Sequence, residues 1–283
     1  MSCKARGYHP DMVRNDSRLG TLADTLSEWG RAALGWVMGW GRVIHFGALI
    51  MVLVLSPSSY SRENRLELAR HLYVNTAPIL LGFSVLCALI SSVLTRIVLV
   101  TSLSYGLSQY ALQLVIRVLV LELIPITAAL FVALRCTIPD GADLARMRRR
   151  GDLEAMRLQG VDPVSREVLP RVAAGVFSCI TLAALSCVVA LVTAYVALYG
   201  FTTTGFTVYT RLFGQVFSPV VTLIFVLKTV FFSLAATLIP MASGVYDITS
   251  GARSRTEAEM SGLVRMFAVM LLIQGLSLVG NYY

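Results

Sequence analysis

The sequence predicts an all-α integral membrane protein, with an N-terminal interfacial helix followed by about five transmembrane helices. Of its 283 residues, 56% are hydrophobic and only 14% are charged, whereas soluble domains average about 25% charged residues. The mean hydropathy is +0.72, and several apolar runs approach the ~20 residues that cross a bilayer. We expect helices because a helix satisfies its own backbone in lipid, and the alternating short segments of a barrel are not visible.

Five apolar segments are long enough to be transmembrane helices. They are expected at about 76–100, 107–135, 168–199, 217–242 and 259–281. The joints at 61–72, 140–171 and 250–255 are rich in arginine, whereas those at 101–106 and 200–215 hold only Arg211. Basic loops favour the cytoplasmic side. We therefore expect the N-terminus and the 140–171 joint inside and the C-terminus outside, and we attribute the net charge of +8 to these loops rather than to nucleic-acid binding.

The N-terminal part divides into a disordered cytoplasmic arm, residues 1–17, and an interfacial or re-entrant helix within 18–60. Trp29, Trp36 and Trp40 are seven and four residues apart and share one helical face. Charged residues occupy the opposite face: Asp24, Arg31 and Arg42. Indole rings at headgroup level are typical of a helix that lies in the membrane surface. The alternative is an ordinary first span that includes 43–55, which would place the N-terminus outside.

Charges inside the expected spans are the strongest candidates for function. Arg96, Arg117, Glu122 and Lys228 each lie within an apolar run, where a charge costs at least ~2.5–3.5 kcal/mol. The steps of four from Gln109 to Gln113 and Arg117 form one polar stripe on a helix. We predict a substrate cavity that contains Gln113, Arg117, Glu122 and Lys228. The alternatives are snorkelling, which we favour for Arg96, and structural ion pairs, including Glu122 with Arg117.

A polar island interrupts the apolar sequence at about 143–160. Leu144, Met147, Leu153 and Met156 give this stretch an apolar side, so it can form an amphipathic helix that another protein binds. Gly160 suits a helix C-cap, and Asp162-Pro163 can start the next turn. The alternative is that this stretch is a basic cytoplasmic loop without a partner. The permease domain as a whole would cover 61–283.

No catalytic or metal-binding motif is present in the sequence. It contains no phosphate-binding loop of the G-x-x-x-x-G-K-[ST] type. Its three histidines are scattered, and its five cysteines show no paired spacing, which argues against a metal centre or a disulfide framework. We therefore expect a protein that is not itself an enzyme and that holds no cofactor.

Three stretches resemble the MlaE/YrbE permeases of ABC systems linked to MCE proteins. They are ELIPITAALFVALR (122–135), DLARMR (143–148) and LEAMRLQGVDPVSREVLPRVAAG (153–175). The run LKTVFF (227–232) resembles a further family segment and includes Lys228. The chain departs from the family at several glycines, and Leu121 stands where an arginine usually precedes the glutamate. It therefore looks like a divergent member.

The resemblance implies a function and a set of partners. The polar island would be a coupling helix that binds a cytoplasmic ATPase, and ATP with Mg²⁺ would be held by that partner. The coupling residues it implies are Asp143, Met147, Arg148, Leu153, Met156, Gly160 and Asp162. It further implies a homodimer in the bacterial inner membrane, a periplasmic MCE-domain protein, and phospholipid or a similar hydrophobic molecule as the substrate.

Two other functions are compatible with an apolar helical chain. A secondary transporter would need no ATPase, but such proteins usually show an internal repeat, and none is visible. A scaffold derived from a permease would keep the fold and lose transport, as the replaced glycines could indicate.

Overall fold

The described part of the chain is almost entirely helical. The computed structural model describes residues 39–53, 62–106, 113–202, 205–246 and 255–282, and no strand occurs among them. Five of its helical segments are long and apolar enough to cross a membrane: 78–104, 113–150, 164–199, 219–245 and 262–280. The predicted all-α membrane fold with five long apolar helices is thus confirmed. The predicted disordered arm at 1–17 and most of the tryptophan face lie outside the described residues.

The elements differ in detail from the expected helices. In chain order they are α2 (Arg62–Ser104), η2 (Ile116–Leu123), α4 (Ile124–Val132), η3 (Ala133–Thr137), α5 (Ile138–Arg150), α6 (Asp152–Leu158), η4 (Val164–Val168), α7 (Leu169–Tyr199), α8 (Phe206–Val216), α9 (Pro219–Val245) and α10 (Arg255–Tyr282). The three η segments are π-helical, which the sequence did not predict. No loop follows residue 135, because the helix continues through η3 into α5.

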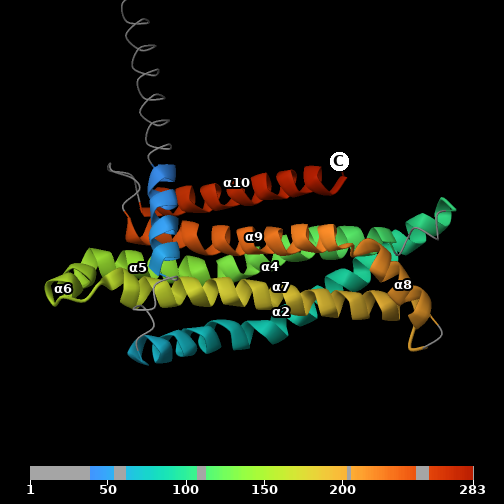
Figure 1. Cartoon of the computed structure of the whole chain (residues 1–283), viewed down its shortest axis with the longest axis horizontal. Coiled ribbons are helices and arrows are strands. Elements are labelled where there is room, and N and C mark those ends of the chain that lie inside the picture. The colour runs from blue at the N-terminus through green and yellow to red at the C-terminus, as the bar shows by residue number, and fades with distance from the viewer. Residues whose placement is uncertain (1–38, 54–61, 107–112, 203–204, 247–254, 283) are drawn as a thin grey trace, which may run out of the picture.

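The long helices run side by side along one axis. Figure 1 shows α7 near the middle, with α2 on one side and α4, α9 and α10 on the other. The pair α5–α6 extends from one end of this bundle, and α8 lies at the other end. A short helix, Gly39–Leu53, lies transverse to the spans at the α5–α6 end of the bundle, where it contacts α9 and α10. That orientation is the one expected of an interfacial helix, and its depth in the membrane stays a prediction.

Small and weakly polar side chains join α2 to α7. The hydroxyls of Thr76 and Ser178 are 2.6 Å apart in a buried hydrogen bond, and the thiol of Cys87 donates to the carbonyl of Ser186 at 3.6 Å. Lipid tails are as apolar as leucine, so helices in a membrane gain their contact from close packing and interhelical hydrogen bonds. The free cysteine thiols are therefore packing residues here, in line with their unpaired spacing in the sequence.

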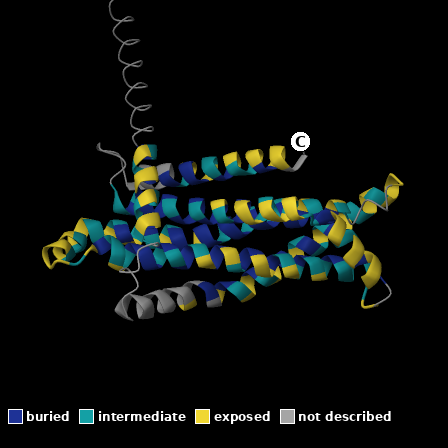
Figure 2. Ribbon diagram, in the orientation of Figure 1, coloured by how far each residue is buried: buried dark blue, intermediate teal, exposed yellow. Residues whose placement is uncertain are grey.

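The outward faces of the spans are apolar. Figure 2 shows exposed residues along the outer side of α2, α9 and α10, and large aliphatic side chains account for many of them. Examples are Leu81, Leu89, Leu223, Leu271 and Leu276. In water such an array would be unstable, but in a bilayer these faces contact hydrocarbon.

Aromatic residues gather at the α8 end of the bundle. The ring of Tyr195 lies 5.2 Å from that of Tyr209 and 5.4 Å from that of Tyr199. The Tyr209 hydroxyl donates to the carbonyl of Leu191 at 2.8 Å, and burial, helped by Tyr199, raises the pKa of Tyr209 to about 12. Tyrosine suits a membrane surface because its ring is apolar and its hydroxyl polar.

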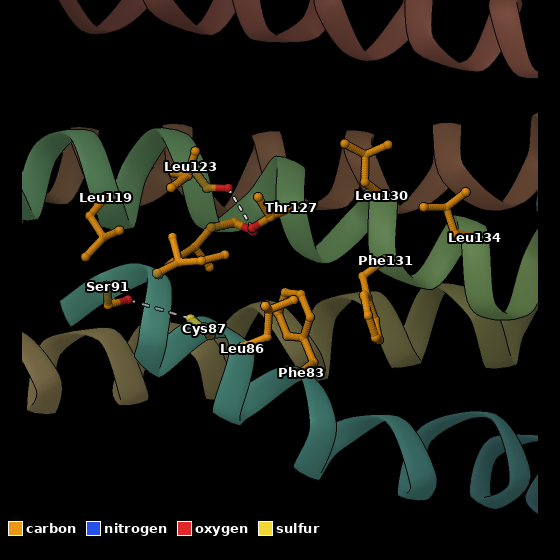
Figure 3. Close-up of a pocket in the computed structure, with 12 residues that line it drawn as sticks. Phe83, Leu86, Cys87, Ser91, Leu119, Leu123, Thr127, Leu130, Phe131 and Leu134 are labelled. Atoms are coloured by element: carbon orange, nitrogen blue, oxygen red, sulfur yellow. Dashed lines mark hydrogen bonds between the residues drawn. The ribbon is translucent and has the colours of Figure 1, made fainter. Parts of the chain in front are cut away.

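A pocket of about 180 Å³ lies between α2 and the η2–α4 segment. Its twelve lining residues are almost all apolar, and Figure 3 shows them on the facing sides of the two helices. We refer to this space as the α2–α4 pocket. None of the four predicted cavity residues lines it.

Candidate functional site

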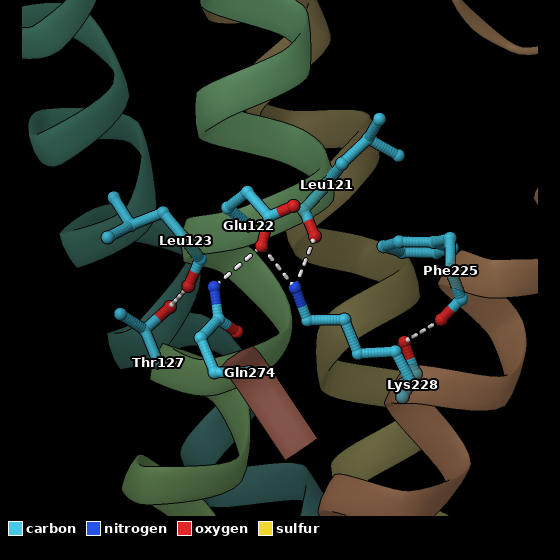
Figure 4. Close-up of polar contacts among 8 residues, drawn as sticks. Leu121, Glu122, Leu123, Thr127, Phe225, Lys228 and Gln274 are labelled. Carbon is cyan, nitrogen blue, oxygen red and sulfur yellow. Dashed lines mark hydrogen bonds and ion pairs between the residues drawn. The ribbon is translucent and has the colours of Figure 1, made fainter. Parts of the chain in front are cut away.

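Two of the predicted charges meet inside the bundle. The Lys228 ammonium of α9 donates to the Glu122 carboxylate of η2, and the two form an ion pair. The side chain of Lys228 is 2% exposed and that of Glu122 is 12% exposed. Figure 4 shows the pair with its neighbours. A buried charge is tolerated when it is paired and hydrogen-bonded, so each residue of the pair depends on the other.

Pro125 explains why the lysine binds at this point of the helix. Proline has no backbone N–H, so the carbonyl four residues earlier, that of Leu121, receives no helical hydrogen bond from it. The Lys228 ammonium donates to this Leu121 carbonyl at 3.1 Å, in addition to its bond with Glu122. The segment L-E-L-I-P (121–125) therefore supplies two adjacent acceptors, a carboxylate and a carbonyl, for one cation.

A third residue completes the cluster and was missed by sequence reasoning. The Gln274 side-chain amide of α10 donates to the Glu122 carboxylate at 2.6 Å, so three helices meet at this carboxylate (Figure 4). The Gln274 Oε1 atom is buried and has no hydrogen-bond partner. A lone glutamine in the apolar run 262–280 was the available signal, because a polar group in a span needs a partner.

The other two predicted cavity residues lie earlier on the same helix as Glu122. Gln113 and Arg117 are half-buried, and Arg117 belongs to η2. Gln109, the first member of the proposed stripe, lies outside the described residues. The structure thus pairs Glu122 with Lys228, and the role of Gln113 and Arg117 in a substrate cavity remains a prediction.

The predicted coupling helix is two helices. We expected one amphipathic helix over 143–160, but α5 ends at Arg150 and α6 begins at Asp152. Gly151 separates them with φ of 81°, a left-handed conformation that glycine adopts without strain. The cause was visible in the sequence, since Gly151 weakens the middle of the helix.

The sequence G-V-D-P shapes the turn after α6. Gly160 has φ of 77°, its N–H donates to the Arg157 carbonyl, and the Val161 N–H donates to the Met156 carbonyl. Together these bonds form the Schellman motif that ends a helix. The Asp162 carboxylate then accepts from the N–H groups of Val164 and Ser165, both at 3.2 Å. Asp162 is therefore the N-cap of the next helix, and Pro163 occupies its first position.

The remaining coupling candidates divide between inward and outward positions. Met147 packs against the hydrophobic core, and an Arg148 guanidinium nitrogen donates to the carbonyl of Val245 at 3.4 Å, at the end of α9. Asp143 is exposed and forms a salt bridge with Arg146 at 3.0 Å, while Leu153 and Met156 are half-buried. Sequence reasoning missed Leu158, whose 84% exposure makes it the most exposed large apolar residue of the pair α5–α6.

The helix α5 is held tightly against the end of α9. A Cβ on Gly141 would lie 2.6 Å from the Pro240 carbonyl oxygen, and a Cβ on Gly244 would overlap the Gly141 carbonyl. Pro240 also frees the Ala236 carbonyl, and the Thr137 hydroxyl of η3 donates to it at 2.6 Å. The arrangement resembles that at Lys228: in both cases a side chain of one helix donates to a carbonyl four residues before a proline of the other, Pro240 in α9 and Pro125 in α4. This close backbone contact leaves α5 little room to shift against α9.

The family model described as Permease MlaE matches residues 68–279. The chain belongs to the MlaE permease family. The match includes the Glu122–Lys228–Gln274 cluster and the pair α5–α6. Among curated proteins, none matches the chain at significance. As an MlaE permease, the chain is a multi-pass membrane protein of the lipid-transport type, and five helices among its described residues are long and apolar enough to span. The helix Gly39–Leu53 lies before the matched segment.

Proposed function

We propose that this MlaE permease is the membrane-spanning subunit of an ABC transporter for phospholipid or a similar hydrophobic molecule. A separate cytoplasmic ATPase would bind the pair α5–α6 and hold ATP and Mg²⁺, so this chain would hydrolyse nothing itself. The complex would contain two copies of the chain in a bacterial inner membrane, with the N-terminus cytoplasmic and an MCE-domain protein on the periplasmic side.

The observation that carries the proposal is the combination of exposure and rigid attachment in the pair α5–α6. Its outer surface presents Leu158 and the arginines 146, 149, 150 and 157. Its inner surface contacts the end of α9 through Gly141 and Arg148. An element that only filled a loop would need neither property. A partner that pushes on such an element moves the span behind it.

The path from the pair leads to the buried cluster. Because α5 and α9 are in backbone contact at Gly141 and Gly244, displacement of α5 displaces α9. Lys228 lies four turns earlier on α9, where it holds the Glu122 carboxylate. The helix that carries Glu122 continues through α4 and η3 into α5, so α5 would act on both partners of the ion pair. A tilt of this helix relative to α9, about their contact at Gly141 and Gly244, would separate Lys228 from Glu122. In the dimer we expect this separation to open a lipid cavity that Gln113, Arg117, Glu122 and Lys228 line.

Binding of the ATPase can be tested with one pair of variants. The tagged protein is purified in mild detergent, and the proteins and lipids that come with it are identified by mass spectrometry. Leu158→Asp should lose the ATPase, because it places a charge in the apolar contact. Phe201→Asp, a change at a 95% exposed residue of the opposite end, should retain it. Purification of the wild-type chain alone and well folded would contradict an ABC transporter.

Transport and assembly can be separated at the buried cluster. Glu122→Gln together with Lys228→Met removes both charges of the pair and leaves neither of them unpaired in the bundle, so the complex should assemble. Lipid transfer between vesicles and the reconstituted complex should fall strongly. If transfer is unchanged and only assembly suffers, the cluster is structural and the chain fits the scaffold alternative better.

A further inference from the structure

The α2–α4 pocket has a closed end and an open end. At the closed end Ser91 is 0% and Leu119 3% exposed, whereas Leu134 at the opposite end is 62% exposed; Leu86, between them, is 42% exposed. Figure 3 shows the two helices diverging toward Leu134. In the bundle this direction leads toward the α5–α6 end (Figure 1).

The few polar groups of the pocket are already used within the protein. The Thr127 hydroxyl donates to the carbonyls of Leu123 and Ile124 at 2.9 and 3.1 Å. Ser91 lies 3.9 Å from the Cys87 sulfur. The rings of Phe83 and Phe131 add an aromatic wall, with centroids 4.8 Å apart. The lining therefore offers a ligand almost nothing but apolar contact.

The size and the place of the pocket select an acyl chain. An apolar cavity of about 150 Å³ stays free of water and binds benzene, so 180 Å³ holds roughly seven carbons. The lining from Leu119 to Leu134 extends about 22 Å at 1.5 Å per residue, against about 15 Å for the hydrocarbon of one leaflet. A chain can thus lie along the open part and fill the closed part with its end.

An exposed cation follows the open end of the pocket in the sequence. Arg135 follows Leu134 directly, at the open end, and is exposed. An exposed guanidinium beside an apolar wedge matches a ligand with an anionic phosphate and a hydrocarbon tail. We propose that the α2–α4 pocket binds one acyl chain of a phospholipid from the leaflet on the α5–α6 side, with the phosphate at Arg135. This inference rests on the proposed function for the transport of the bound lipid, but its test does not.

The test is photo-labelling of the purified full chain in vesicles without ATPase or ATP. The vesicles are phosphatidylcholine with a trace of phosphatidylglycerol that carries a diazirine at the end of one acyl chain. Labelled residues are mapped by mass spectrometry. We expect several-fold more label at 83–91 and 119–124 than on the outward face of α9 around Leu223 and Leu227.

Variants assign the label to the pocket and to the cation. Thr127→Phe fills the pocket and should remove the excess label, whereas Ala184→Phe, on the exposed face of α7, should keep it. Arg135→Gln should lower labelling by the phosphatidylglycerol probe but not by a diacylglycerol with the same chain. Because Thr127→Phe could disturb folding, the wild-type map is decisive by itself.

The outcomes separate this inference from the proposed function. Label spread evenly over all lipid-facing helices would overturn the pocket assignment, even if the complex transports lipid. Concentrated label in the pocket, together with an assembled complex that transfers no lipid, would support the assignment and overturn the proposed function.

Discussion

Removal of the Lys228 ammonium should cost the fold about 3–5 kcal/mol, the range for breaking a buried ion pair by deleting one partner. The structure supports the full range because both side chains are buried, at 2% and 12% exposure. Lys228→Met keeps the unbranched stem, so the change removes mainly charge and hydrogen bonds. It leaves the Glu122 carboxylate with the Gln274 amide, and it removes the donor of the Leu121 carbonyl.

A double-mutant cycle tests whether the pair is the cause. Glu122→Gln combined with Lys228→Met leaves no unpaired charge, so the double variant should be more stable than Lys228→Met alone. The expected coupling energy is about 2–3 kcal/mol, near the upper end for residues in contact. Arg96→Met is the matched control, because Arg96 is an exposed arginine in an apolar helix; its cost should be small.

The free energy of unfolding can be measured by denaturant titration of the purified protein in mixed micelles, with refolding checked for reversibility. Lipid transfer by the reconstituted complex is measured in parallel. A cost below about 1 kcal/mol for Lys228→Met, or additive effects in the cycle, would refute the reasoning. Two buried charges that water does not screen must contribute a measurable interaction energy to the fold.

Three further changes test helix packing at the two ends of the bundle, each by the same unfolding titration. Thr137→Val orphans a buried carbonyl and should cost about 1–3 kcal/mol, but much less in a Pro240→Ala background, where the new N–H binds that carbonyl. Gly244→Ala should cost about 1–3 kcal/mol by overpacking α5 against α9, whereas Gly214→Ala in open space should stabilise by about 0.5–1 kcal/mol. Tyr209→Phe should cost about 1 kcal/mol through the lost hydrogen bond.

Long-range sequence signals predicted the elements of this protein well. Apolar runs of span length and arginine-rich joints located five helices, because length and hydropathy are properties of each segment alone. The cap residues were equally readable. Gly160 and Asp162 act within a few residues of their own positions, so their roles in the turn follow from local geometry.

Contacts between helices were not readable from one segment. From the sequence, Glu122 could either pair with Arg117 or belong to a functional site. The sequence does not show which residues of two spans lie opposite each other, so it could not decide between them. The structure supplies that register and brings Lys228 and Gln274 to the carboxylate from 106 and 152 residues away. The π-helical segments were missed for the same reason, since their hydrogen bonds depend on the packing around them.

Two prolines link signals within one segment to contacts between helices. In the sequence, Pro125 and Pro240 look like breaks in apolar helices, yet both helices continue through them. Pro240 leaves the Ala236 carbonyl without its α-helical donor, and in hydrocarbon such a carbonyl needs another. Thr137 is that donor, and Lys228 donates in the same way to the Leu121 carbonyl, four residues before Pro125. At both places the group that binds near the proline is a polar side chain of the opposite helix. Here the need for a donor places Lys228, the only lysine among the described residues, against Glu122. The Thr137 bond joins the same two spans a second time, next to α5.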